Sequence, residues 1–135
     1  MGRILGLDIG AKRTGVAISD ELGIIASPLT TLPSGQLMSH LAQWVDEYQL
    51  QTIVIGEPKN LQGRDSDNSY LVNQVRRKIT ERFPNMVLVS IDERFTSKMA
   101  SQSLVQSGMK KSKRRNKEEL DKVSAAIILQ DYLDS

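Results

Sequence analysis

The chain contains no cysteine, one histidine and few aromatic residues. Without cysteine it can form neither a disulfide framework nor a thiolate metal site. The single histidine, His40, falls in a helical pattern with no nucleophile motif around it, which gives serine-nucleophile chemistry little support. No long apolar run or signal-like start is present, so we expect neither export nor membrane insertion but a cytoplasmic protein.

The length favours a single domain. We expect residues 1–135 to form one unit, because a folded chain of this size buries roughly two-thirds of the surface that its unfolded form exposes. We find no internal repeat and no linker. The glycines form neither a P-loop nor a dinucleotide-binding fingerprint.

Positive charge is concentrated in residues 110–117, KKSKRRNK. The formal net charge of the chain is only +2, yet this segment holds six of the 18 Lys and Arg residues and none of the 16 acids. A basic segment on an otherwise acidic body indicates a polyanionic partner, although a solvated charge run would look the same. With only two Phe, three Tyr and one Trp, we expect a nucleic acid to be recognised by shape and backbone rather than by base stacking.

Hydrophobic periodicity predicts three strands, then strands that alternate with helices. The strands are expected at 4–9, 16–18, 24–32, 52–56 and 86–91, and the helices at 35–50, 70–82, 96–107 and 118–133. Pro28 marks an edge strand or a bulge, and the apolar run 52–56 is typical of a central strand covered on both faces. This order predicts an α/β fold, a mixed five-stranded sheet flanked by helices.

An acid, Asp8, stands inside the first predicted strand. An ionised carboxylate away from water is costly unless it is paired, hydrogen-bonded or bound to metal. Asp8 is therefore either satisfied structurally or held for chemistry. We take residues 10–15, with Lys12 and Arg13 among them, as the turn that follows this strand.

Further acids stand where a site is expected. Asp92 and Glu93 follow the last predicted strand, and Asp121 opens the final helix, on one face with Ala125, Ile128 and Tyr132. Three carboxylates that converge at one edge of the sheet would require divalent cations, and oxygen ligands favour Mg²⁺ or Mn²⁺. Alternatively, the pair at 92 and 93 bridges to Arg94, and Asp121 only favours the helix start.

Four motifs together resemble the YqgF family, also called RuvX-like. They are LDIGAKRTGVAISD, IGEPKNLQG, IDERFTS and LDKVSAAIILQDYLD, in the family's order and spacing over nearly the whole chain. The family is known for Holliday junction resolvases and for nucleases that process the 5′ end of precursor 16S rRNA. The resemblance implies a ribonuclease H-like fold. It also implies that Asp8, Glu93 and Asp121 are catalytic and hold the metal.

Two observations qualify this resemblance. The first motif also resembles the phosphate-binding hairpin of actin-like and sugar-kinase ATPases, but those proteins resemble two such domains and this chain supplies one. The residue at position 57 departs from the family pattern, which usually has an apolar residue there. We expect Glu57 to face solvent, although it would alternatively join the metal cluster.

The sequence thus predicts a Mg²⁺- or Mn²⁺-dependent nuclease that acts on structured RNA, most simply on precursor 16S rRNA. We expect backbone-phosphate contacts from the basic residues, which are Lys12, Arg13, Arg94, Lys110, Lys111, Lys113, Arg114, Arg115 and Lys117. One alternative is a resolvase of four-way DNA junctions, which would act as a homodimer. Another is a ribosome-assembly protein that binds RNA without cleaving it.

Overall fold

The computed structural model describes residues 2–57, 69–92 and 117–135, and for 117–120 the backbone only. The predicted helix at 96–107 lies outside the described residues. The other predicted elements are all present, with ends that differ from the prediction by a few residues.

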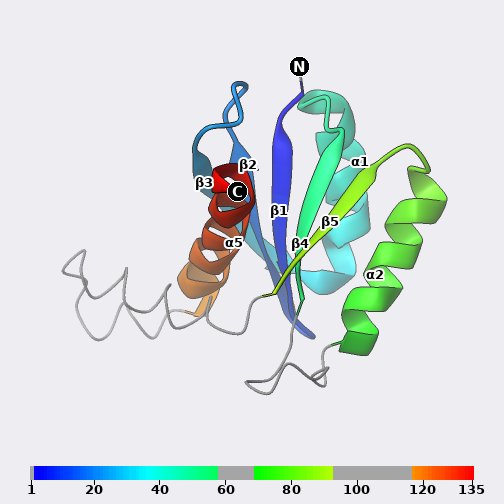
Figure 1. Cartoon of the computed structure of the whole chain (residues 1–135). Coiled ribbons are helices and arrows are strands. Elements are labelled where there is room, and N and C mark those ends of the chain that lie inside the picture. The colour runs from blue at the N-terminus through cyan, green and yellow to red at the C-terminus, as the bar shows by residue number, and fades with distance from the viewer. Residues whose placement is uncertain (1, 58–68, 93–116) are drawn as a thin grey trace.

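The core of the fold is a five-stranded sheet in the order β3-β2-β1-β4-β5 (Figure 1). β1 (Ile4–Ile9), β2 (Arg13–Ser19) and β3 (Ala26–Pro33) form an antiparallel meander. β4 (Thr52–Glu57) pairs parallel to β1, and β5 (Val87–Asp92) pairs parallel to β4. The predicted mixed sheet is confirmed, and the carboxyl ends of β1, β4 and β5 meet at one edge, called here the carboxyl edge.

The first hairpin differs from the prediction in its turn. β2 already begins at Arg13, so Gly15 is a strand residue and not part of the turn. The prediction of a turn over residues 10–15 was therefore too long, because a glycine within a strand reads as a turn signal in the sequence. Pro28 lies on edge strand β3, next to a register shift in its pairing with β2, which confirms both expectations for this proline.

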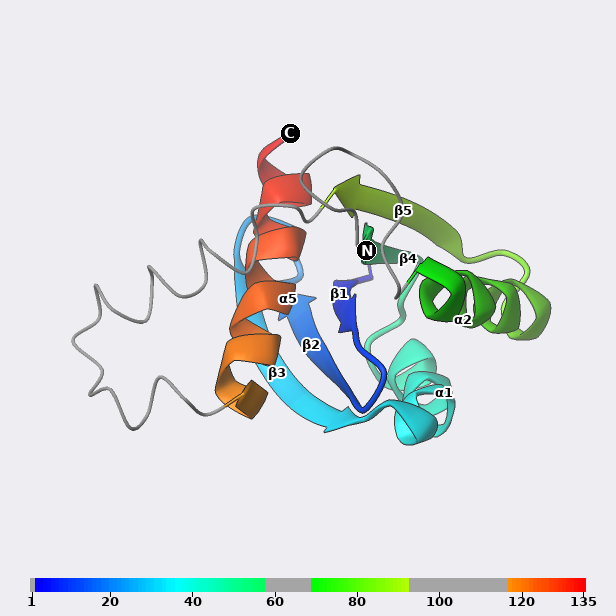
Figure 2. The same cartoon turned by 90° about the horizontal axis from the view of Figure 1, so that it is seen from below.

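One face of the sheet carries α1 (Leu37–Glu47) and α2 (Ser69–Arg82), with a short 3-10 turn, η1 (Ser34–Gln36), before α1 (Figure 2). Large aliphatic side chains fill this layer. Leu5, Leu7 and Ile55 from the strands are fully buried against Leu41 of α1 and Ile79 of α2. This face holds the larger hydrophobic core.

The opposite face is covered by α5 (Lys117–Asp134), which Figure 2 shows on the other side of the sheet from α1 and α2. Its core consists of Ala17, Val54, Ala125, Ile128 and Leu129, and several of these side chains are small. No helix within the described ranges is long and apolar enough to cross a membrane.

Candidate functional site

Asp8 lies near the end of β1, on the face covered by α5. A Cβ atom built on Gly6 would come within 2.8 Å of the Leu129 Cβ, so Gly6 faces α5. Side chains two residues apart on a strand share a face, and Asp8 therefore faces the same side. Asp8 is half-buried and takes part in an interaction, and it lies at the carboxyl edge.

Asp121 is brought close to Asp8 by a glycine. Gly15 of β2 is the cross-strand partner of Asp8, and a Cβ on Gly15 would lie 2.1 Å from the Asp121 carbonyl oxygen. Only a residue without a side chain permits α5 to approach the sheet this closely. Two acids separated by more than a hundred residues of sequence thus lie at one edge and on one face.

An arginine from the first hairpin pairs with this second acid. The Arg13 Nε donates a hydrogen bond of 3.1 Å to Asp121 Oδ2, and the side chains are 35% and 27% exposed. The preceding turn is held in place by Ser34, whose backbone N–H donates to the Lys12 carbonyl and whose Oγ donates to the Gly10 carbonyl. The hairpin therefore presents Arg13 from a well-anchored turn.

The strand register bears on the choice between Asp92 and Glu93 as the third acid. Asp92 pairs with Glu57, whose side chain bonds Arg76 of α2, and Leu88 of the same strand packs into the core under α1 and α2. By alternation Asp92 belongs to that face, the one opposite Asp8. Of the two acids that the sequence left open, Asp92 is thus on the wrong face to share a metal with Asp8.

Glu57 does not face solvent, and that prediction was wrong. Its Oε1 accepts a hydrogen bond from Arg76 Nη2, and the glutamate side chain is only 19% exposed. It joins no metal site with Asp8 either, because it lies on the α2 side of the sheet. The sequence could not reveal this pairing, since it depends on where α2 packs.

Most of the predicted basic contacts cannot be placed. Glu93, the third predicted metal ligand, lies outside the described residues. The same holds for Arg94, Lys110, Lys111, Lys113, Arg114 and Arg115, and for the side chain of Lys117. Among the described residues, no three His, Cys, Asp or Glu side chains lie close enough together to hold a metal ion.

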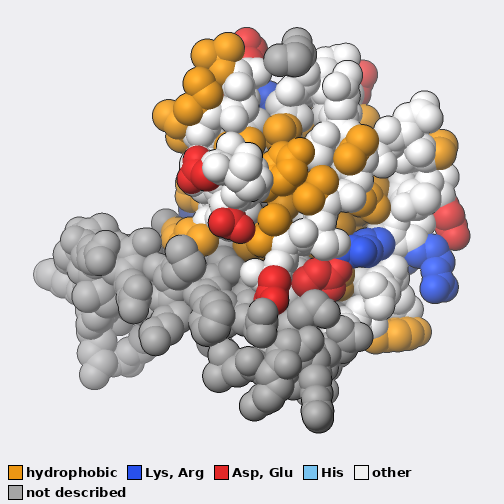
Figure 3. Space-filling view, viewed as in Figure 1, with side chains coloured by type: hydrophobic (Ala, Val, Ile, Leu, Met, Phe, Trp, Pro, Cys, Tyr) orange, Lys and Arg blue, Asp and Glu red, His pale blue; other side chains and the backbone are white. Residues whose placement is uncertain are grey.

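The described donors nevertheless fit a hard divalent cation. Asp8 and Asp121 offer carboxylate oxygens only, and no nitrogen or sulfur ligand accompanies them in the part of the chain described here. In the space-filling view, acidic side chains lie at the lower border of the described surface, and others are scattered over the same view (Figure 3). Oxygen donors of this kind suit Mg²⁺ or Mn²⁺ better than zinc or copper.

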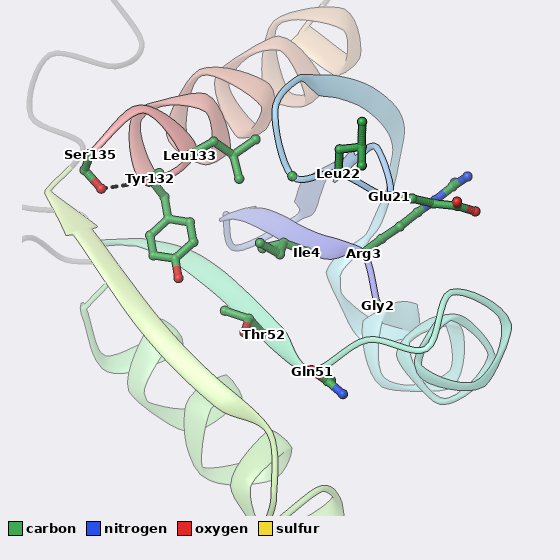
Figure 4. Close-up of a pocket in the computed structure, with 11 residues that line it drawn as sticks. Gly2, Arg3, Ile4, Glu21, Leu22, Gln51, Thr52, Tyr132, Leu133 and Ser135 are labelled. Carbon is green, nitrogen blue, oxygen red and sulfur yellow. Dashed lines mark hydrogen bonds between the residues drawn. The ribbon is translucent and has the colours of Figure 1, made fainter.

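A pocket of about 440 Å³ lies at the opposite end of the sheet (Figure 4). Ile4 and Thr52, at the starts of β1 and β4, line it together with Tyr132 from the end of α5. It contains neither Asp8 nor Asp121. The hollow is therefore separate from the carboxyl edge where the acids lie.

The sequence did not indicate the role of Gly15. Gly15 makes the approach of α5 possible, and the available signal was a glycine inside an apolar strand pattern, which often marks a close backbone approach. The Arg13–Asp121 pair joins residues 108 positions apart and had no local signal.

Comparison with known families identifies the chain. The model of the RuvX family, described as Holliday junction resolvase, matches residues 2–135. The chain belongs to the RuvX family. This agrees with the four motifs that resemble YqgF proteins.

Curated relatives match over essentially their full length. A protein of Flavobacterium johnsoniae is 44% identical over 135 residues, which is all of this chain and 98% of the relative. One from Flavobacterium psychrophilum is 45% identical over 133 residues, 98% of this chain and 97% of the relative. Both are named "Putative pre-16S rRNA nuclease".

Solved structures of two resolvases share the fold. A chain of Thermus thermophilus RuvC in complex with a Holliday junction substrate aligns with a TM-score of 0.57 at 12% identity, covering 95% of this chain and 92% of that one. The yeast mitochondrial Holliday junction resolvase Ydc2 aligns with a TM-score of 0.58 at 11% identity, covering 98% and 78%. These likenesses place the RuvX chain in the ribonuclease H-like fold.

Proposed function

We propose that this RuvX protein is a cytoplasmic, single-domain, metal-dependent nuclease that processes the 5′ end of precursor 16S rRNA. The observation that carries the proposal is the placement of Asp8 and Asp121 on one face at the carboxyl edge, with Gly15 between them. The names of the curated relatives support the choice of substrate.

Asp8, Asp121 and Glu93 are the proposed metal ligands. Strand alternation assigns Asp92 to the α2 face, which leaves its neighbour Glu93, the acid that the family resemblance implies, as the candidate. Bound Mg²⁺ or Mn²⁺ would supply Lewis-acid activation of water and neutralise charge on the scissile phosphate. The three carboxylates would hold the ions at the carboxyl edge.

The basic residues are proposed to position the substrate. Lys12 is exposed in the turn between β1 and β2, next to Arg13 in the chain, where it would contact a backbone phosphate. Arg94 and the basic residues of 110–117 are proposed to extend this contact. Because such contacts neutralise phosphate charge, binding should weaken steeply as salt is raised.

Cleavage of four-way DNA junctions is the second candidate. It is favoured by the family description and by the fold shared with RuvC and Ydc2. A resolvase would act as a homodimer that presents two sites to symmetric strands. An RNA-binding assembly role without cleavage is the candidate from another functional class.

The test compares three substrates with purified full-length protein. A precursor 16S leader, a four-way DNA junction and ATP are each incubated with Mg²⁺ or Mn²⁺. The variant is Asp8→Asn, which keeps the shape of the side chain and removes its charge. Asp131→Asn, an exposed aspartate on α5, is the matched control.

We expect metal-dependent cleavage of the leader by the wild type and by Asp131→Asn, and none by Asp8→Asn. Cleavage of the junction alone would replace the RNA assignment by the resolvase. Binding of the leader without cleavage would favour the assembly role, and metal-dependent ATP hydrolysis would favour the ATPase likeness. Leader cleavage that persists in Asp8→Asn would overturn the metal site.

A further inference from the structure

Arg13 pairs with a carboxylate that the proposed metal site would use. The hydrogen bond from Arg13 Nε to Asp121 Oδ2 measures 3.1 Å, and it connects the first residue of β2 with α5. Arginine is always charged, and a bond between a guanidinium and a carboxylate is one of the stronger polar contacts in proteins. Asp121 therefore already has a cationic partner in the fold.

A divalent ion bound to Asp121 and the Arg13 guanidinium would repel one another. Arg13 lies next to the site, and its positive charge repels a cation that arrives at the same carboxylate. The pair is only partly buried, with 35% and 27% of the two side chains exposed, so the contact is weak enough to exchange. The Arg76–Glu57 pair on the other face has less exposed side chains and no predicted ligand role.

We propose that Arg13 is an exchangeable counter-ion for Asp121. It holds the carboxylate while the site lacks a cation, and it passes to a phosphate of the substrate when the cation takes its place. Charge favours this exchange, because the incoming ion neutralises Asp121 at the same time as the nucleic acid brings a negative partner for Arg13. The inference rests on the proposed nuclease function and makes Arg13 a positioning residue within it.

Lys12 provides a matched comparison within the same turn. It carries the same charge as Arg13 and is the preceding residue, but its side chain is exposed, and the carboxylate of Asp121 bonds its neighbour instead. Removing Lys12 removes one positive charge near the acids without removing the Asp121 pair. A difference between the two substitutions thus reports the pair itself, and not the general electrostatics of the hairpin.

The test measures Mn²⁺ binding to the full-length protein by calorimetry, with no nucleic acid present. The proteins are the wild type, Arg13→Gln, Lys12→Gln and Asp121→Asn. We expect Arg13→Gln to bind Mn²⁺ about two- to fivefold more tightly, given the size of partly exposed charge interactions. Lys12→Gln should change the affinity less, and Asp121→Asn should weaken binding.

A second measurement follows the substrate side of the exchange. In EDTA the leader RNA should bind to the wild type and to Arg13→Gln with similar Kd, because Asp121 still holds Arg13 in the wild type. With Mn²⁺ present, the KM for cleavage should rise in Arg13→Gln. A purely structural role for the arginine predicts weaker binding of both Mn²⁺ and RNA in every condition.

Mn²⁺ binding that is equal or weaker in Arg13→Gln would overturn the proposal, and so would the absence of measurable binding in both proteins. The failure of the nuclease assignment is separate, because it would appear as no cleavage by any of these proteins. In that case the order of the Mn²⁺ affinities still decides whether Arg13 competes with the cation.

Discussion

The two faces of the sheet are covered in different ways. Under α1 and α2 the strands present large aliphatic residues such as Leu7 and Ile55, which form the larger core. Under α5 the same strands present Gly6, Gly15 and Ala17, and the helix comes close enough to touch the backbone. The first face stabilises the fold, and the second brings Asp121 to Asp8.

The same contrast holds for the two arginine–carboxylate pairs. Arg76–Glu57 lies on the face of α2 and ties that helix to the end of β4. Arg13–Asp121 lies on the face of α5 and includes a proposed metal ligand. Similar chemistry is therefore found beside the larger core on one side of the sheet and at the proposed site on the other.

The largest effect is expected from a side chain at Gly15, because it would disrupt the packing of α5 on the sheet. Gly15→Ala would place a Cβ atom 2.1 Å from a backbone oxygen of Asp121, which α5 can relieve only by moving away. We expect a loss of about 3 kcal/mol in the free energy of unfolding, together with reduced cleavage. Chemical denaturation and leader cleavage measure the two effects.

Gly35→Ala is the control for this substitution, because a Cβ there would meet nothing within 4 Å. Its free energy of unfolding should stay within about 0.5 kcal/mol of the wild type. If Gly15→Ala were as stable and as active as Gly35→Ala, the close contact between α5 and β2 would not be required.

Breaking the pair on the opposite face should lower stability and spare the chemistry. Glu57→Gln removes the charge that faces Arg76, a partly buried guanidinium whose Nε has no hydrogen-bond partner among the described residues. We expect a loss of about 1–2 kcal/mol by chemical denaturation, with cleavage unchanged at temperatures where the variant is folded. The matched control is Glu81→Gln, because Glu81 is an exposed glutamate on α2, the helix that carries Arg76.

The contrary outcome for Glu57→Gln is a large loss of cleavage at full stability. It would show that the carboxylate at position 57 belongs to the metal site after all. The separation of the two faces would then fail as an account of which acids are catalytic.

The smallest effect on stability is expected from Asp20→Asn, in the turn between β2 and β3. Backbone hydrogen bonds from Ile25 and Ile24 lower the pKa of Asp20 from its ordinary value of 3.8. A lowered pKa in the folded state means that the ionised carboxylate adds stability above pH 3.8, and that this is lost as the pH falls through the folded value. The Tm difference between the wild type and Asp20→Asn should therefore shrink below about pH 4. A difference that grew in acid would contradict this assignment.

The sequence predicted the order of the strands because periodicity and the positions of Pro28 and the apolar run 52–56 are local signals. Asp8 was recognised because an acid interrupts an apolar strand. The face of Asp92 could not be predicted, since it depends on its register with Glu57 across two parallel strands. Pairs such as Arg13–Asp121 arise only when α5 folds back on the sheet.

The most direct test of the separation between the faces compares Asp8→Asn with Asp92→Asn in Mn²⁺-dependent cleavage of the precursor 16S leader. Replacing a residue that only supports a metal ligand typically lowers activity 10- to 100-fold. Asp8 is proposed as a ligand itself, so we expect Asp8→Asn to lose at least about a hundredfold in kcat/KM. Asp92→Asn should remain within about threefold of the wild type, as expected for a residue outside the metal site. Equal losses in the two variants, or a larger loss in Asp92→Asn, would contradict the placement of the site on the α5 face.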